Sequence, residues 1–170
     1  RGGCSLLDGL AKRARCCGEP MSQSRVRRPR VLVIGLQGLG NLLLSSSLLV
    51  HLEECADADV TVLVPDVTAA QLMGAVPGRR EILVAGRFRR AALVAHLVAR
   101  RFDTAIVAYP GGPRSVTLAW LSGARCRIGH VGRQGWLART LLSRALEPTP
   151  GRHDVEHNLE LAECALRESG

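Results

Sequence analysis

The 170 residues match the usual length of one domain, and 46% of them are hydrophobic, which is enough to build one core. The net charge of +8 is uneven: residues 1–30 carry eight bases and two acids, whereas the other 140 residues carry fifteen bases and thirteen acids. The basic excess therefore lies mainly near the N-terminus. We expect no nucleic-acid partner, because the sequence has neither an aromatic stacking platform nor a recognition motif.

Residues 1–29 form a polar, arginine-rich leader without hydrophobic periodicity, and we expect it to be disordered. It has no apolar segment typical of a signal peptide. Residues 31–52 carry no formal charge and are long enough to span a membrane. Glycines, Gln37, Asn41 and three serines interrupt this stretch, however, which favours a strand, a turn and a buried helix.

After the leader, the hydrophobic pattern predicts strands that alternate with helices. The predicted strands are short and apolar, as expected of strands buried on both faces, and cover residues 30–35, 60–64, 81–85, 103–109 and 125–129. Helices are predicted over residues 41–56, 66–74, 89–101, 114–121, 136–144 and 155–167. This alternation predicts a doubly wound, mostly parallel α/β fold, in which ligands bind at the carboxyl ends of the strands.

The six cysteines form no CxxC pair, and no Cys–His spacing suits zinc, so the sequence predicts no metal site. Cys55 and Cys164 lie in predicted helices and Cys126 in a predicted strand. We therefore expect buried, reduced thiols, which are typical of cytoplasmic proteins.

The first predicted loop, Gly35–Asn41, is rich in glycine. Glycine allows a tight turn and close approach of a ligand to the backbone, and the following helix offers free N–H groups to an anion. Gly38 and Gly40 match the first half of the dinucleotide-binding fingerprint G-x-G-x-x-G, but Leu43 occupies the position of its third glycine. With Asp66 as the ribose-binding acid, a small dinucleotide-binding α/β module is one candidate function.

Three stretches in order along the chain indicate another function. They are RVLVIGLQGLGNLLLSSSLLVHL (residues 30–52), FDTAIVAYPGGPRSVTLAWLSGARCRIGH (residues 102–130) and His153-Asp-Val-Glu156. In this order and spacing they resemble glycosyltransferase family nine, the ADP-heptose:lipopolysaccharide heptosyltransferases. The matching pieces span residues 30–167.

The resemblance implies the Rossmann-like N-terminal half of an inverting GT-B glycosyltransferase. Residues 30–147 would form the acceptor-side domain, and residues 148–170 a linker and C-terminal helix leading to a second domain that this chain lacks. A nucleotide-sugar donor such as ADP-heptose would bind that second domain, and no cofactor is expected. Because transfer needs both halves, we expect the chain to be inactive alone.

The resemblance also implies partners and a location. The acceptor would be an anionic glycolipid or glycan. The enzyme would be cytoplasmic, with a peripheral contact with the inner face of the membrane.

In the family resembled, the catalytic base is an aspartate at the position of Asn41. A carboxamide cannot accept a proton at a useful pH, so Asn41 cannot replace that base. We expect Asn41 to cap the N-terminus of the first helix, and it is open whether Asn41 also orients an acceptor hydroxyl. Asp66 is an alternative base.

Seven arginines within 23 residues form the basic cluster, opposed in that stretch only by Glu81. They are Arg79, Arg80, Arg87, Arg89, Arg90, Arg100 and Arg101. Guanidinium groups suit phosphate and carboxylate, so we predict that Arg87, Arg89 and Arg90 bind the acceptor. Arg114 stands where the family often has a basic residue, and we predict the same role for it. The alternative is that these arginines form an ordinary solvated surface.

Four further side chains have structural interpretations. His153 and Glu156 are interpreted as docking the last helix rather than as an acid–base pair. Trp120 and Trp136 are interpreted as packing anchors.

Overall fold

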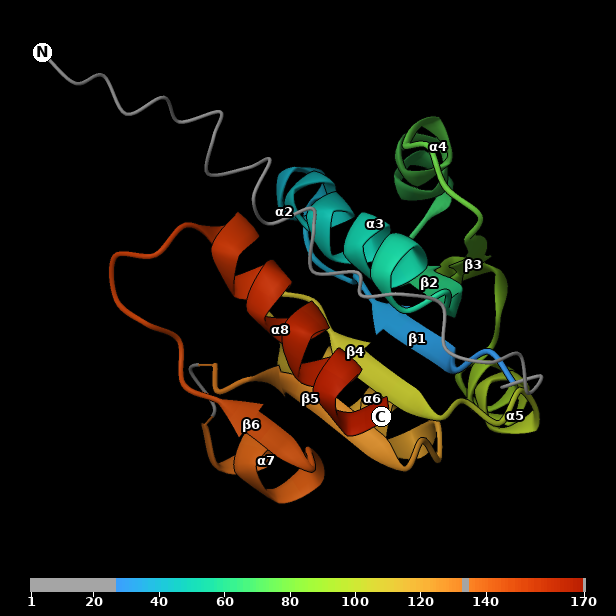
Figure 1. Cartoon of the computed structure of the whole chain (residues 1–170). Coiled ribbons are helices and arrows are strands. Elements are labelled where there is room, and N and C mark those ends of the chain that lie inside the picture. The colour runs from blue at the N-terminus through green and yellow to red at the C-terminus, as the bar shows by residue number, and fades with distance from the viewer. Residues whose placement is uncertain (1–26, 133–134, 170) are drawn as a thin grey trace, which may run out of the picture.

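The computed structural model describes residues 27–132 and 135–169, in which six strands alternate with helices (Figure 1). Residues 1–26, most of the predicted leader, lie outside the described part. In chain order the elements are β1 (Arg30–Ile34), α2 (Leu39–Leu44), α3 (Ser46–Cys55), β2 (Asp59–Val64), α4 (Val67–Ala75), β3 (Glu81–Val84), the 3₁₀ turn η1 (Ala85–Arg87), α5 (Arg90–Ala99), β4 (Thr104–Val107), α6 (Pro113–Leu121), β5 (Cys126–His130), α7 (Gly135–Leu141), β6 (Arg144–Leu146) and α8 (Asp154–Ser169).

The strands form one parallel sheet in the order β3-β2-β1-β4-β5-β6. The central strand β1 pairs with β2 on one side and β4 on the other, so that Val31 lies between Val60 and Thr104. The chain therefore reverses its direction of winding between β1 and β4, and ligands of such sheets bind outside the carboxyl ends of the strands near that point. The predicted doubly wound α/β fold is confirmed.

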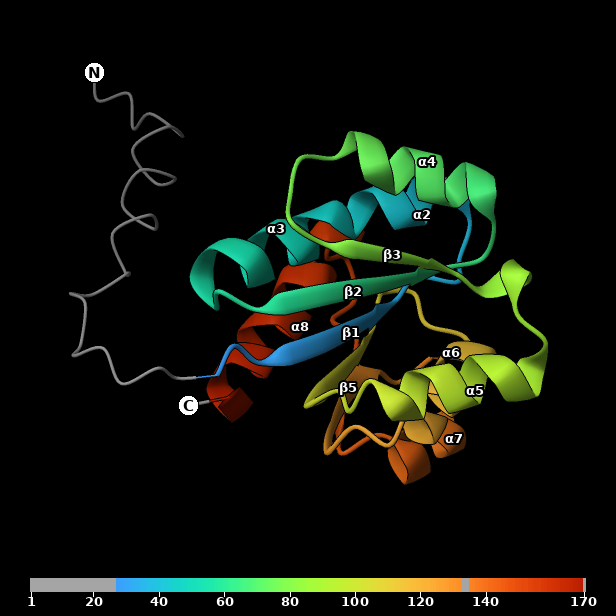
Figure 2. The same ribbon diagram turned by 90° about the vertical axis from the view of Figure 1, so that its right-hand side faces the viewer.

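Helices cover both faces of the sheet (Figure 2). One face packs against α2, α3, α4 and α8, and the other against α5, α6 and α7. Val31 and Val33 of β1 point into the first layer, whereas Leu32 and Ile34 point into the second. All four are buried, which explains the uninterrupted apolar run of this strand.

Two predicted boundaries are wrong. The helix predicted over residues 41–56 consists of two helices that meet at Ser45, whose hydroxyl donates to the carbonyl of Leu42 at 2.6 Å. Such back-bonding by serine bends helices. The helix predicted over residues 136–144 ends at Leu141, and β6 follows. This strand has only three residues and exists because it pairs with β5, so it has no hydrophobic period of its own.

The thiols are more accessible than predicted. Cys55 is exposed at the end of α3, and Cys126 and Cys164 are half-buried. Partial burial raises the pKa of the Cys126 and Cys164 thiols. Within the described ranges, no helix combines the length and the apolar character needed to cross a membrane.

Three of the seven arginines of the basic cluster, Arg79, Arg80 and Arg100, form ion pairs at the amino end of the sheet. Arg79 pairs with Asp57 and lowers the pKa of that carboxyl, and Arg100 pairs with Glu81 and has the same effect on its partner. Glu81 is the acid within the arginine-rich stretch, and Asp57 comes from outside it.

The ion pair between Arg80 and Glu53 is buried. Nε of Arg80 donates to Oε1 of Glu53 at 2.7 Å, and a terminal guanidinium nitrogen donates to Oε2 at 3.0 Å. The side chains are only 3% and 7% exposed. The pair fastens α3 to the segment before β3, so Arg80 has a structural role.

We predict that Arg80→Ala destabilises the protein by about 3–5 kcal/mol, because it leaves the carboxylate of Glu53 buried without its partner. Arg79→Ala is the matched control, since Arg79 forms an exposed ion pair and its loss should change little. Urea unfolding measures both variants. Equal stability of the two variants would contradict the structural role of Arg80.

Candidate functional site

The loop after β1 lies at the carboxyl end of the sheet, and its glycines differ in their surroundings. A Cβ at Gly35 would lie 2.5 Å from Cδ1 of the buried Leu42, so Gly35 allows α2 to pack closely on the sheet. A Cβ at Gly38 or Gly40 would meet no atom within 4 Å. The packing therefore does not require Gly38 and Gly40, and the space beside them is open to a ligand.

Asn41 does not cap the first helix, and that prediction is wrong. Helix α2 begins at Leu39 after Gly38, whose backbone is extended, which makes Asn41 the third helical residue. Its side chain is half-buried and has no hydrogen-bond partner among the described residues. The carboxamide therefore lies at the carboxyl end of the sheet with its hydrogen-bonding capacity free.

Asp66 is the residue that caps a helix. Its Oδ1 accepts a hydrogen bond from the backbone N–H of Ala69 at 2.9 Å at the start of α4. This contact gives Asp66 a structural reason for its position.

The predicted acceptor-binding arginines lie on two loops at the carboxyl end of the sheet. Arg87 ends the 3₁₀ turn after β3, Arg89 immediately precedes α5, and Arg90 is the first residue of α5. Arg114 is the second residue of α6, after β4. All four are exposed, and none has an ion-pair partner within the described ranges.

Arg90 and Arg114 come together at one cavity between α5 and α6. The cavity has a volume of about 350 Å³, and its other lining residues are Leu93, Val94, Thr117, Leu118 and Leu121. No side chain caps the N-terminus of either helix. The two guanidinium groups therefore make this cavity favourable for an anion.

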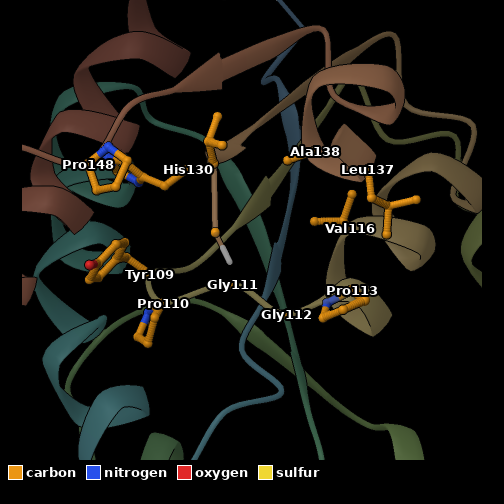
Figure 3. A pocket seen from close by; sticks show the side chains of 12 residues that line it. Tyr109, Pro110, Gly111, Gly112, Pro113, Val116, His130, Leu137, Ala138 and Pro148 are labelled. Atoms are coloured by element: carbon orange, nitrogen blue, oxygen red, sulfur yellow. The ribbon is translucent and has the colours of Figure 1, made fainter. Parts of the chain in front are cut away.

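A larger cavity, of about 600 Å³, lies between the loops that follow β4 and β5 (Figure 3). Val116, Leu137 and Ala138 form one wall, and Tyr109, His130 and Pro148 form the opposite wall. Gly111 and Gly112 form part of the lining between them. The cavity thus has an apolar side and an aromatic side.

The aromatic wall rests on helix α8. The rings of Tyr109 and His157 lie 4.4 Å apart, and the ring of His130 lies within 5.1 Å of both. Oδ1 of the fully buried Asn158 accepts a hydrogen bond from the backbone N–H of Tyr109 at 3.0 Å, and Nδ2 of Asn158 donates to the carbonyl of Asp154 at 2.9 Å. The amide therefore joins α8 to the loop that carries Tyr109.

His130 has an unusual environment. Its side chain is 1% exposed, and Glu160 lies 3.6 Å away. Burial lowers the pKa of His130, the nearby His157 lowers it further, and Glu160 opposes the shift.

The residues of the aromatic wall and of α8 behind it were not predicted from the sequence. His130 was only the end of a matching segment, and neither His157 nor Asn158 belongs to the His153-Asp-Val-Glu156 motif. His153 itself is exposed, and its Nδ1 accepts a hydrogen bond from the N–H of Val155 at 3.3 Å at the start of α8. The docking of α8 instead rests on Leu161, Ala162 and Ala165, which are buried against the sheet layer.

The two tryptophans are not packing anchors. Trp120 is 51% exposed and Trp136 is 70% exposed. The prediction failed because it rested on residue type alone.

Several solved structures that this chain resembles are glycosyltransferases. Heptosyltransferase II of E. coli, described as an ADP-heptose lipopolysaccharide heptosyltransferase, superposes with a TM-score of 0.67 at 25% identity, covering 78% of this chain and 40% of that one. The chain has the heptosyltransferase-like fold of glycosyltransferase family 9. E. coli heptosyltransferase WaaC with ADP matches with a TM-score of 0.64 at 22% identity, covering 81% of this chain and 46% of that one.

A family 9 glycosyltransferase from Veillonella parvula matches this chain with a TM-score of 0.63 at 23% identity, covering 79% of this chain and 40% of that one. The chain thus spans less than half the length of the structures that it resembles. No protein-family model and no curated protein sequence matches the chain.

We predict that Asn158→Ala destabilises the protein by about 1–3 kcal/mol, because the partly buried N–H of Tyr109 loses its hydrogen-bond partner. Asn41→Ala is the control, since no hydrogen bond is lost there. Chemical denaturation followed by circular dichroism compares the two variants. A stable Asn158→Ala variant would mean that the amide does not hold α8 to the Tyr109 loop.

Proposed function

We propose that the chain is the acceptor-binding domain of an inverting GT-B glycosyltransferase. The reaction would transfer a heptose-like sugar from a nucleotide-sugar donor to an anionic glycolipid or glycan. The heptosyltransferase-like fold supports the reaction class. The observation that carries the proposal is the shared position of Arg90 and Arg114 at one cavity.

These two arginines suit an anionic acceptor for a physical reason. Each stands in the first turn of a helix that lacks a side-chain cap, at the carboxyl end of the sheet. A phosphate or carboxylate there would accept hydrogen bonds from a planar guanidinium and from backbone N–H groups. Leu93, Leu118 and Leu121 would contact the apolar part of a sugar or lipid.

The donor half of the reaction is assigned to a second domain. The family resemblance implies that the nucleotide sugar binds there, and Asn41 cannot act as the base that accepts the acceptor's proton. We therefore propose that this chain binds the acceptor without transferring a sugar to it unaided. Arg87, Arg89, Gly38 and Gly40 are proposed as further contacts beside Arg90 and Arg114.

The binding role can be tested with vesicles. We predict that the chain binds vesicles of a phosphorylated glycolipid in preference to the dephosphorylated glycolipid, and that raising the salt concentration weakens the binding. The double variant Arg90→Ala, Arg114→Ala should bind at least about 10-fold more weakly, because charge-assisted hydrogen bonds are lost. Arg125→Ala is the control, since this exposed arginine precedes β5 at the amino end of the sheet.

Two results would contradict the proposal. One is equal binding by the double variant and the Arg125→Ala control. The other is binding of a nicotinamide dinucleotide without binding of the glycolipid, which would favour the dinucleotide-binding module. Isothermal titration with the dinucleotide separates these cases.

A second prediction concerns Asn41. In the protein joined to a nucleotide-sugar domain, Asn41→Asp should raise the rate of transfer, because a carboxylate supplies the missing base; general-base catalysis typically contributes about 10²–10⁴-fold. Asn41→Ser is the control, as it changes the side chain without adding a base. An Asn41→Asp rate no higher than that of Asn41→Ser would place the base elsewhere.

A further inference from the structure

Three side chains with metal-binding groups meet behind the aromatic wall of the larger cavity. They are His130 at the end of β5 and His157 and Glu160 in α8. One potential ligand atom of each lies within 4.8 Å of the other two. Oε2 of Glu160 is 3.6 Å from Nε2 of His130 and 3.9 Å from Nδ1 of His157.

The two imidazoles are almost completely buried. Their side chains are 1% and 2% exposed. Within the described ranges, neither ring nitrogen of His130 has a hydrogen-bond partner, and Nδ1 of His157 has none. Buried polar atoms in folded proteins are almost always satisfied, so three such atoms in one place require an explanation.

We propose that His130, His157 and Glu160 form a binding site for a divalent transition-metal ion of the zinc type. Neutral imidazole nitrogens and a carboxylate oxygen are common zinc ligands. With metal–ligand distances of about 2.0–2.2 Å, the ligand atoms of a tetrahedral site are about 3.3–3.6 Å apart. The two distances from Glu160, 3.6 and 3.9 Å, are close to this range. The ligand atoms all lie within 4.8 Å of one another, so a metal would draw the two imidazoles together by at most about 1.5 Å.

The position of the site assigns it a structural role. His130 belongs to the sheet, whereas His157 and Glu160 belong to the helix that packs across it, so a shared ion would fasten α8 to β5. The rings of both histidines contact Tyr109, and the ion would fix the wall of the cavity from behind. This inference is independent of the proposed acceptor-binding role.

Glu160 also contacts Arg152, whose guanidinium lies 3.3 Å from the same Oε2. Arg152 is half exposed and can move away when an ion binds. It therefore provides a control within the site: Arg152→Gln removes a competing cation and leaves the three ligands intact.

The test is isothermal titration of the chelator-treated full chain with Zn²⁺. We expect the wild-type protein and Arg152→Gln to bind Zn²⁺ at this site. His130→Gln, His157→Gln and Glu160→Gln should each bind Zn²⁺ at least about 10-fold more weakly. His51→Gln is the control for adventitious binding, since His51 lies 3.9 Å from the sulfur of Cys55 in a separate part of the molecule. Zinc should also raise the Tm of the wild-type protein more than that of the ligand variants.

Cobalt gives a second readout that does not depend on the folding of any variant. The visible spectrum of the Co²⁺-loaded wild-type protein should show tetrahedral nitrogen and oxygen ligation without thiolate-to-cobalt charge transfer. No zinc binding by the wild-type protein would overturn the proposal. So would zinc binding that the three ligand variants retain, or a cobalt spectrum with thiolate ligation.

Discussion

The burial of a parallel sheet on both faces is the constraint on which the rest of this structure depends. Because helices cover the apolar strands on each side, polar chemistry is confined to the two ends of the strands. The two ends differ. At the amino end, Arg79, Arg80 and Arg100 are neutralised by carboxylates, and these pairs fasten neighbouring elements together. At the carboxyl end, Arg90 and Arg114 face a cavity without an ion-pair partner in the described part of the chain.

Helix α8 gives this carboxyl end its shape. It returns to the sheet after β6 and packs beside α2 and α3 (Figure 1). From there Asn158 holds the backbone of Tyr109, and His157 and Glu160 reach His130. The larger cavity therefore depends on a helix from the last part of the chain. The resemblance predicts that this helix leads to the donor domain, so docking of α8 would connect the two proposed halves of the enzyme.

The fold was predictable because buried parallel strands have an apolar, β-branched signature of their own, as Arg30–Ile34 and Asp59–Val64 show. The strand β6 was not, because its three residues become a strand only by pairing with β5. The alternation of strands and helices predicts that Arg90 and Arg114 lie at the carboxyl end of the sheet. It does not predict that the two side chains line the same cavity. The cluster of His130, His157 and Glu160 had no signal in the sequence, because 26 residues lie between the two histidines and the packing of α8 brings them together. The position of Asn41 was misjudged because the extended backbone of Gly38 starts α2 earlier than the apolar pattern implies.

The central claim is that the carboxyl end of the sheet binds an anionic sugar. Backbone NMR spectra of the labelled chain, recorded during titration with a phosphorylated sugar, test it most directly because they report every amide at once. If the sugar binds there, the largest shifts occur at the starts of α5 and α6, around Arg90 and Arg114, while amides at the amino end stay in place. Shifts concentrated around Arg30, Asp59 and Arg79, which line a cavity at the amino end, would contradict it.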